Sequence, residues 1–202
     1  MRFISQVSER CTIFSDVILP SGDVAEVFYR NSSEVVQRAL SRLLPSLQSH
    51  HVGLIDGNSV LSVARNVALC GHRPSRVTSL PPITLVELFS SILNINTIPK
   101  RSFFASMAVF AADDAERDKL VELSTGAGTD LYFDYCIKEK RNFIEVLEEF
   151  PSVRPTLNAL LATIPVIQPR QYSIASSAAV DNCKVGLCIA VVKYRTRLGR
   201  SR

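Results

Sequence analysis

The amino-acid sequence predicts an α+β fold: a partial antiparallel β-barrel that is interrupted by an inserted all-helical domain. Apolar and polar residues alternate near both ends of the chain, in residues 12–30 and 166–197. Between these regions the apolar residues recur every three or four positions, most continuously over residues 84–164. A period of two is typical of strands and a period of 3.6 of helices, so two β regions flank a long helical block.

Prolines mark where one kind of structure gives way to the other. Leu80-Pro81-Pro82 precedes the helical block, and Pro165 follows it. Because proline interrupts both helices and strand ladders, it is common at such boundaries. We therefore divide the chain into residues 1–82, the first part of the barrel with one helix; residues 83–164, a helical connecting insertion; and residues 165–202, further barrel strands.

The first region contains β segments and a helix. Thr12–Leu19 and Val24–Arg30 are strand-like, and the tetrad Pro-Ser-Gly-Asp between them is a typical turn. The run Asn-Ser-Ser-Glu that follows is a helix start, and one apolar helix face extends from there to Pro45, where we expect the helix to end. A further strand is predicted over Val60–Ala64.

Two helix starts are predicted in the helical block from capping boxes. Thr84 stands three residues before Glu87, and Asp113 stands three residues before Glu116, each pair ahead of an apolar helical pattern. In such a box the side chain of the N-cap residue accepts a hydrogen bond from the backbone N–H three residues later. The acidic side chain of that later residue accepts one from the backbone N–H of the N-cap residue. We expect a reciprocal box at both places.

The segment Gln168–Ser177 carries the candidate ligand-binding residues. Its sequence is strand-like, so Arg170 and Tyr172 share one face, and Gln171 and Ser173 lie on the other. A guanidinium can bind phosphate bidentately, a phenol ring can cover a flat heterocycle, and a serine hydroxyl can donate to a ring nitrogen or carbonyl. A flat phosphorylated ligand is one interpretation; an ordinary strand with a surface arginine is the other.

A second C-terminal strand is predicted from Val185 to Arg197. Its two faces are both apolar up to Val192. A strand with two apolar faces is covered on both sides, so it lies either centrally in a closed barrel or beneath a ligand.

The composition argues against several classes of protein. The longest apolar runs, such as Val185–Val192, are far shorter than the roughly 20 residues that a membrane helix needs. Five scattered cysteines are an odd number, which argues against a disulfide framework; three histidines and no C-x-x-C pair argue against a metal site. We expect a cytoplasmic protein with no membrane contact and no bound metal.

The charge is unevenly distributed. Residues 113–150 hold eleven acidic and five basic side chains, although the whole chain has a net charge of +4. One interpretation of the basic C-terminal run is a nucleic-acid-binding arm, but no RNA or DNA module is recognisable, and Tyr194 is the only aromatic residue interleaved with the basic residues. No nucleic-acid partner is therefore expected. The basic residues of this run are Lys193, Arg195, Arg197, Arg200 and Arg202.

The R-x-Y-S sequence at residues 170–173 resembles the flavin signature of the ferredoxin–NADP reductase superfamily, and residues 97–197 resemble diflavin reductases. Within that family, the chain is most similar to the NADPH-dependent diflavin oxidoreductases of cytosolic iron–sulfur cluster assembly. Five runs carry the resemblance in the expected order: IPKRSFFASM, ERDKLVELS, DLYFDYC, IEVLEEFPS and IPVIQPRQYSIASS.

The resemblance implies FAD as the cofactor and assigns roles to the signature residues. Arg170 would hold the pyrophosphate or ribityl region, Tyr172 would cover the isoalloxazine, and Ser173 would lie near the redox-active N5 as the candidate catalytic residue. Alternate residues of the next strand would line the flavin: Cys188, Ala190 and Tyr194.

The family also implies a function for the parent protein. Electrons would pass from NADPH through FAD to FMN and then to a protein acceptor, so the parent's FMN and NADPH domains are expected partners. The sequence contains no G-x-G-x-x-G nucleotide loop and no flavodoxin-like segment, so we expect a fragment whose barrel is truncated. The rival hypothesis is a non-catalytic paralogue whose helical block docks another protein.

Overall fold

The computed structural model describes residues 23–49, 58, 60–61, 82–177, 185–190 and 195. The described residues form two compact units. The sheet unit combines residues up to Tyr29 with Gln168–Tyr194 and Arg202, and the helical unit comprises Arg30–Ile167 together with Arg195–Ser201. The sheet unit is therefore discontinuous in sequence, and the helices are inserted between its two parts.

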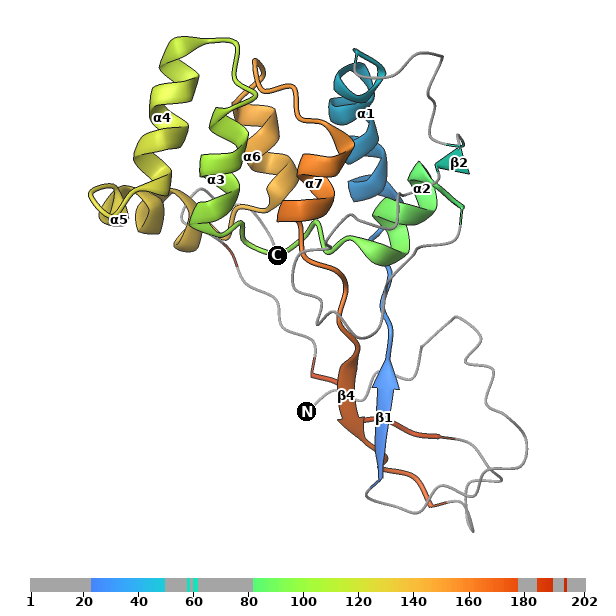
Figure 1. Ribbon diagram of the computed structural model, residues 1–202. Helices are drawn as coiled ribbons and strands as arrows, with labels where there is room; N and C mark the ends of the chain where they lie inside the picture. The colour runs from blue at the N-terminus through green and yellow to red at the C-terminus, as the bar shows by residue number, and fades with distance from the viewer. Residues whose placement is uncertain are drawn as a thin grey trace. The chain divides into compact units, whose positions relative to one another are not determined.

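The sheet unit is built on one antiparallel strand pair. Strand β1 (Val24–Val27) pairs with β4 (Arg170–Ser173), and Figure 1 shows the two arrows side by side. Just beyond β4, Ile174 forms an isolated antiparallel bridge with Leu187. The predicted strand from Val185 is represented by this single bridge in the described residues. Those residues contain short antiparallel ladders and no closed barrel.

The helical unit consists of seven helices, two π-helical segments and one small strand pair in its described part. Strand β2 (Val60–Leu61) pairs antiparallel with β3 (Ile83–Thr84), so the prediction of a strand beginning at Val60 is confirmed for its first two residues. The elements are α1 (Ser33–Ser49), β2 (Val60–Leu61), β3 (Ile83–Thr84), α2 (Leu85–Glu87), η1 (Leu88–Ile92), α3 (Arg101–Ala108), α4 (Asp114–Ser124), α5 (Thr129–Tyr132), η2 (Phe133–Ile137), α6 (Phe143–Glu149) and α7 (Leu157–Thr163).

Helix α1 continues through Pro45, so the prediction that it ends there is wrong. The residues after the proline are held by the helical unit: Ser46 and Leu47 are both buried, and the Ser46 hydroxyl donates to the Pro155 carbonyl at 2.9 Å. Proline in a helix interior costs about 3 kcal/mol. Packing of the final turn offsets that cost.

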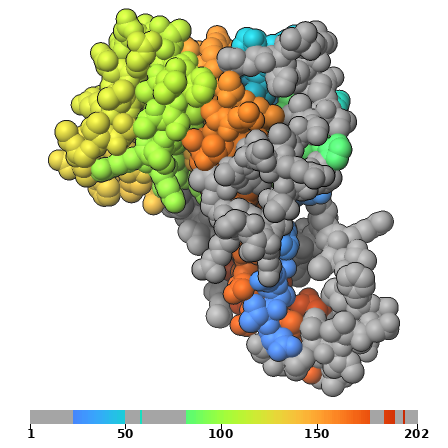
Figure 2. Space-filling model, in the orientation of Figure 1, coloured from blue at the N-terminus to red at the C-terminus, as the bar shows by residue number. Residues whose placement is uncertain are grey.

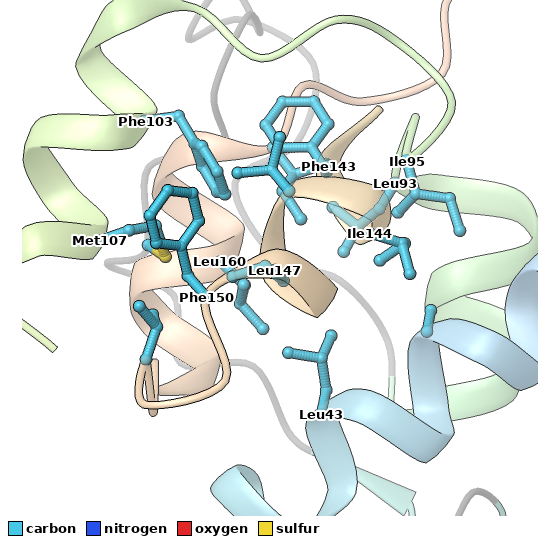
Figure 3. Close-up of a cluster of buried hydrophobic side chains, with 14 of the residues drawn as sticks. Leu43, Leu93, Ile95, Phe103, Met107, Phe143, Ile144, Leu147, Phe150 and Leu160 are labelled. Atoms are coloured by element: carbon cyan, nitrogen blue, oxygen red, sulfur yellow. The ribbon is translucent and has the colours of Figure 1, made fainter. Parts of the chain in front are cut away.

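The core of the helical unit is formed by apolar side chains from helices far apart in the sequence. Figure 3 shows Leu43 of α1, Phe103 of α3 and Leu160 of α7 in one buried cluster with residues of α6. The rings of Phe103 and Phe143 meet edge to face, with centroids 4.8 Å apart. Edge-to-face contact is a preferred arrangement of aromatic pairs, and it fixes α3 on α6.

Helix α3 also contacts α4 and α7, and Figure 2 shows the three as neighbouring patches on the viewed face of the helical unit. None of the helices in the described ranges is both long and apolar enough to cross a membrane.

Candidate functional site

The candidate site is the strand β4 with its surroundings in the sheet unit. The register places Arg170 opposite Val27 and Tyr172 opposite Ala25. Directly opposed residues of an antiparallel pair lie on the same face of the sheet. The structure therefore brings Arg170 and Tyr172 together on one face, as the sequence predicts.

Arg170 lies on an aromatic ring that the sequence analysis did not identify. Its guanidinium carbon is 4.9 Å from the centroid of Tyr29, which continues the alternation of Ala25 and Val27 on the same face. Arg170 is exposed, and among the described residues no carboxylate forms a salt bridge with it. A cation held over a ring keeps its N–H donors available. The arrangement suits a phosphate group.

Tyr172 is half-buried, and the residue opposite it is small. An alanine methyl at position 25 covers little of a phenol ring. A ring beside a small neighbour has part of its face available for stacking, which is what a flat ligand requires.

Ser173 lies on the other face of β4, so the structure does not group its side chain with those of Arg170 and Tyr172. It stands opposite the exposed Val24, and its neighbour on that face, Gln171, donates to the Glu26 carboxylate at 3.1 Å. Ser173 is exposed. Its hydroxyl can reach a ligand only around the edge of the strand.

The backbone groups of β4 alternate between the edge that faces β1 and the opposite edge. Opposed residues of an antiparallel ladder form either hydrogen-bonded or non-hydrogen-bonded pairs. The N–H of Ile174 donates to the Asp23 carbonyl at 2.7 Å, so Ile174 and Asp23 form a hydrogen-bonded pair. Such pairs alternate along an antiparallel ladder. The backbone groups of Arg170 and Tyr172 therefore point toward β1, and those of Gln171 and Ser173 point toward the opposite edge.

The segment from Val185 approaches the end of β4. The Ala175 N–H donates to the Gly186 carbonyl at 2.9 Å, and the Gly186 N–H donates to the Ser176 hydroxyl at 2.8 Å. A Cβ at Gly186 would lie 3.3 Å from that of Ser176, so the chains approach too closely for an easy glycine replacement. Continuing the bridge of Ile174 and Leu187 by one residue places Cys188 opposite Ser173.

Two of the three residues predicted on the second strand lie in the described part of the chain. Cys188 and Ala190 are both exposed. Tyr194 lies outside the described residues. The isolated bridge of Ile174 and Leu187 brings Cys188 toward Ser173, whereas Ala190 takes part in no strand pairing among the described residues.

The buried cysteine of the helical unit is not suited to nucleophilic chemistry. Burial raises the pKa of the Cys136 thiol to about 12, and the nearby Arg141 only partly opposes this effect. A reactive cysteine requires the thiolate. The described residues also contain no group of three or more His, Cys, Asp or Glu side chains that is arranged to hold a metal ion.

Comparison with known proteins shows which family the chain is similar to. Residues 16–202 match the family model described as FAD binding domain. NADPH-dependent diflavin oxidoreductase 1 of Danio rerio is 34% identical over 190 residues, which are 93% of this chain and 30% of that protein. The protein of the same name from Emericella nidulans is 31% identical over 197 residues, 95% of this chain and 30% of its own length. The inducible nitric oxide synthase of Bos taurus is 32% identical over 181 residues, 89% of this chain and 14% of that protein. The chain thus spans less than a third of the length of these relatives.

Proposed function

From the premise that this chain belongs to the FAD binding domain family, we propose that its sheet unit holds FAD on the face of β4 that carries Arg170 and Tyr172, as part of an NADPH-dependent diflavin oxidoreductase. The observation that carries the proposal is the pairing of β4 with β1. It sets a guanidinium over Tyr29 and a half-buried phenol ring two residues away on the same face.

The residues present fit the two chemically different parts of the cofactor. Arg170 would bind phosphate oxygens, because its planar fork of donors matches them and its place over Tyr29 holds it at the surface. Tyr172 would cover the flat isoalloxazine. The flavin, when bound, supplies the hydride and electron chemistry, and the protein orients it and excludes competing reactions.

Residues at the edge of β4 would contact the polar rim of the ring system. The Ser173 hydroxyl is exposed near that edge, and Cys188 lies opposite Ser173 if the bridge of Ile174 and Leu187 continues. We assign Ser173 the place nearest the redox-active N5. Ala190 and Tyr194 would line the same ligand from the second strand.

In the parent protein, electrons would pass from NADPH through FAD to FMN and on to a protein acceptor in the cytoplasm. The parent would be an oxidoreductase of the type that serves iron–sulfur cluster assembly. The similarity to relatives named NADPH-dependent diflavin oxidoreductase supports the use of NADPH and of two flavins. The FMN and NADPH domains of that parent would be the partners of this chain.

The test is a titration of the purified 202-residue chain with FAD, followed by flavin fluorescence. Saturable binding of one FAD per chain is expected, together with no measurable oxidation of NADPH, because the sequence contains no recognisable nicotinamide-nucleotide loop. Absence of FAD binding by a chain that is folded by circular dichroism would refute the proposed site. NADPH oxidation would refute the assignment of that activity to another domain.

A further inference from the structure

Asn31 is a buried polar residue with an unusually complete set of partners at the place where the chain leaves the sheet unit. Its side-chain N–H groups donate to the carbonyls of Phe89 and Leu93, both at 2.7 Å. Its side-chain oxygen accepts from the Asn96 amide at 3.1 Å, and its backbone N–H donates to the Ser90 carbonyl at 2.9 Å. Only 6% of Asn31 is exposed.

The returning chain is fastened to the same segment. Val166 forms an antiparallel bridge with Leu93, and the Ile167 N–H donates to the Ile92 carbonyl at 2.7 Å. The Asn94 N–H donates to the Pro165 carbonyl at 2.8 Å. Residues 89–96 therefore hold both chain segments from which the strands of the sheet unit extend. We call this segment the anchor.

The two links between the anchor and the strand pair are both short and similar in length. Asn31 lies four residues after Val27. On the returning chain, Ile167 lies three residues before Arg170, which is the register partner of Val27. A ladder that slipped by two residues would need one link to lengthen by about 7 Å while the other remained fixed. Because both links are bound to the anchor, such a change of register is disfavoured.

We propose that Asn31 is a positioning residue, which fixes the register of β1 on β4 and thereby sets Arg170 opposite Val27 and over Tyr29. The side chain acts through the anchor and touches no ligand. A short strand pair that is half exposed has weak intrinsic register preference, so an external constraint is needed. The inference goes beyond flavin binding, because the register is defined whether or not a ligand is present.

A cross-strand disulfide measures the register directly. Glu26 and Gln171 form a pair that is not of the hydrogen-bonded kind, for which the Cα separation of about 4.5 Å permits a disulfide. Glu26→Cys with Gln171→Cys, in a Cys188→Ser background, would be oxidised under mild conditions. The rate of formation of the 26–171 disulfide would be followed by peptide mapping, at a temperature where circular dichroism shows the helices to be folded.

Asn31→Ala removes three side-chain hydrogen bonds, so it is expected to slow formation of this disulfide by at least ~5-fold, the factor that corresponds to loss of a single buried hydrogen bond. Ser46→Ala is the matched control, because Ser46 is also buried in the helical unit and its hydroxyl also donates to a backbone carbonyl. It is expected to lower the melting temperature without changing the disulfide rate.

If Asn31→Ala prevents folding, Asn96→Ala takes its place, because it removes only the bond to the Asn31 side-chain oxygen. A smaller slowing is then expected. The proposal is overturned if the folded Asn31 or Asn96 variant forms the disulfide as fast as the parent, or if Ser46→Ala slows it equally.

Discussion

Replacing Arg170 by lysine separates a phosphate-binding role from a structural one. Lysine keeps the positive charge but cannot make two parallel hydrogen bonds to one phosphate. A hydrogen bond to a charged group contributes about 1.5–3 kcal/mol, and the exposure of Arg170 favours the lower end of that range. FAD and FMN should therefore bind roughly tenfold more weakly to the Arg170→Lys variant.

The same substitution should have little effect on stability. The contact of Arg170 with the Tyr29 ring, at 4.9 Å, contributes about 0.5–1 kcal/mol at an exposed site, and a lysine ammonium can retain part of it. Riboflavin has no phosphate, so its affinity should change by less than about twofold if only phosphate contacts are lost.

The assay is a fluorescence titration of the parent and variant with FAD, FMN and riboflavin. Arg101→Lys is the matched control: its guanidinium lies 5.3 Å from the Tyr132 ring in the helical unit, so it repeats the chemical change away from β4. It should alter none of the three affinities. An unchanged FAD affinity at unchanged stability, or an equal loss for all three flavins, would refute the phosphate role of Arg170.

Three other experiments test separate parts of the structure. Tyr172→Ala should weaken FAD binding by about 1–3 kcal/mol, the scale of stacking on an aromatic ring, with unchanged helical circular dichroism; equal affinities would contradict the stacking role. Arg42→Ala should lower the free energy of unfolding by ~2–4 kcal/mol in urea, because the guanidinium donates to three carbonyls around the end of α6, whereas Arg38→Ala should lose at most ~1 kcal/mol with its exposed ion pair. Similar losses for the two arginines would contradict that reasoning. The folded-state pKa of Cys136, about 12, exceeds the ordinary value of 9.0, so the unfolded chain loses this proton first and stability falls as the pH rises between those values. Cys136→Ala should remove that part of the slope, up to ~1.4 kcal/mol per pH unit, and parallel pH curves for parent and variant would exclude the effect.

Helix starts show what local sequence can and cannot predict. Thr84 and Asp113 each accept a hydrogen bond from the backbone N–H three residues later, so both predicted caps are confirmed. Neither box is reciprocal, because each acid finds a partner elsewhere in the fold. Glu87 pairs with Arg30, and Glu116 accepts from the backbone and hydroxyl of Ser152.

The one reciprocal capping box in the described residues, at Asn142 and Glu145, was not predicted. Asn142 donates its backbone N–H to the Glu145 carboxylate, and the asparagine side chain accepts in return. Both residues are buried. Asparagine followed by glutamate is a weaker sequence pattern than threonine or serine followed by glutamate, and the preceding run of charged residues does not distinguish a loop from a helix.

The candidate site was predictable within one strand but not across strands. Alternation was sufficient to place Arg170 and Tyr172 on one face, because it requires only that the segment be extended. The contact between Arg170 and Tyr29 depends on which residue of β1 lies opposite Arg170. The register between two distant segments is not encoded in either segment alone. A similar reason applies to Pro45, where packing of α1 overrides a local helix-stop signal.

The insertion of the helices between the two halves of the sheet has a consequence for the order of folding. Glu26 and Gln171, which face each other in the ladder and whose side chains are hydrogen-bonded, are 145 residues apart in the sequence. Closing a flexible loop of that length costs ~4 kcal/mol of chain entropy. Once the helices have folded, with both outgoing segments bound to residues 89–96, most of that entropy is already lost and strand pairing becomes a nearly local event. We expect amides of the helical core to gain protection from hydrogen exchange before those of β1 during refolding. On the ribosome, the first strand must wait unpaired until the entire helical insertion has been synthesised.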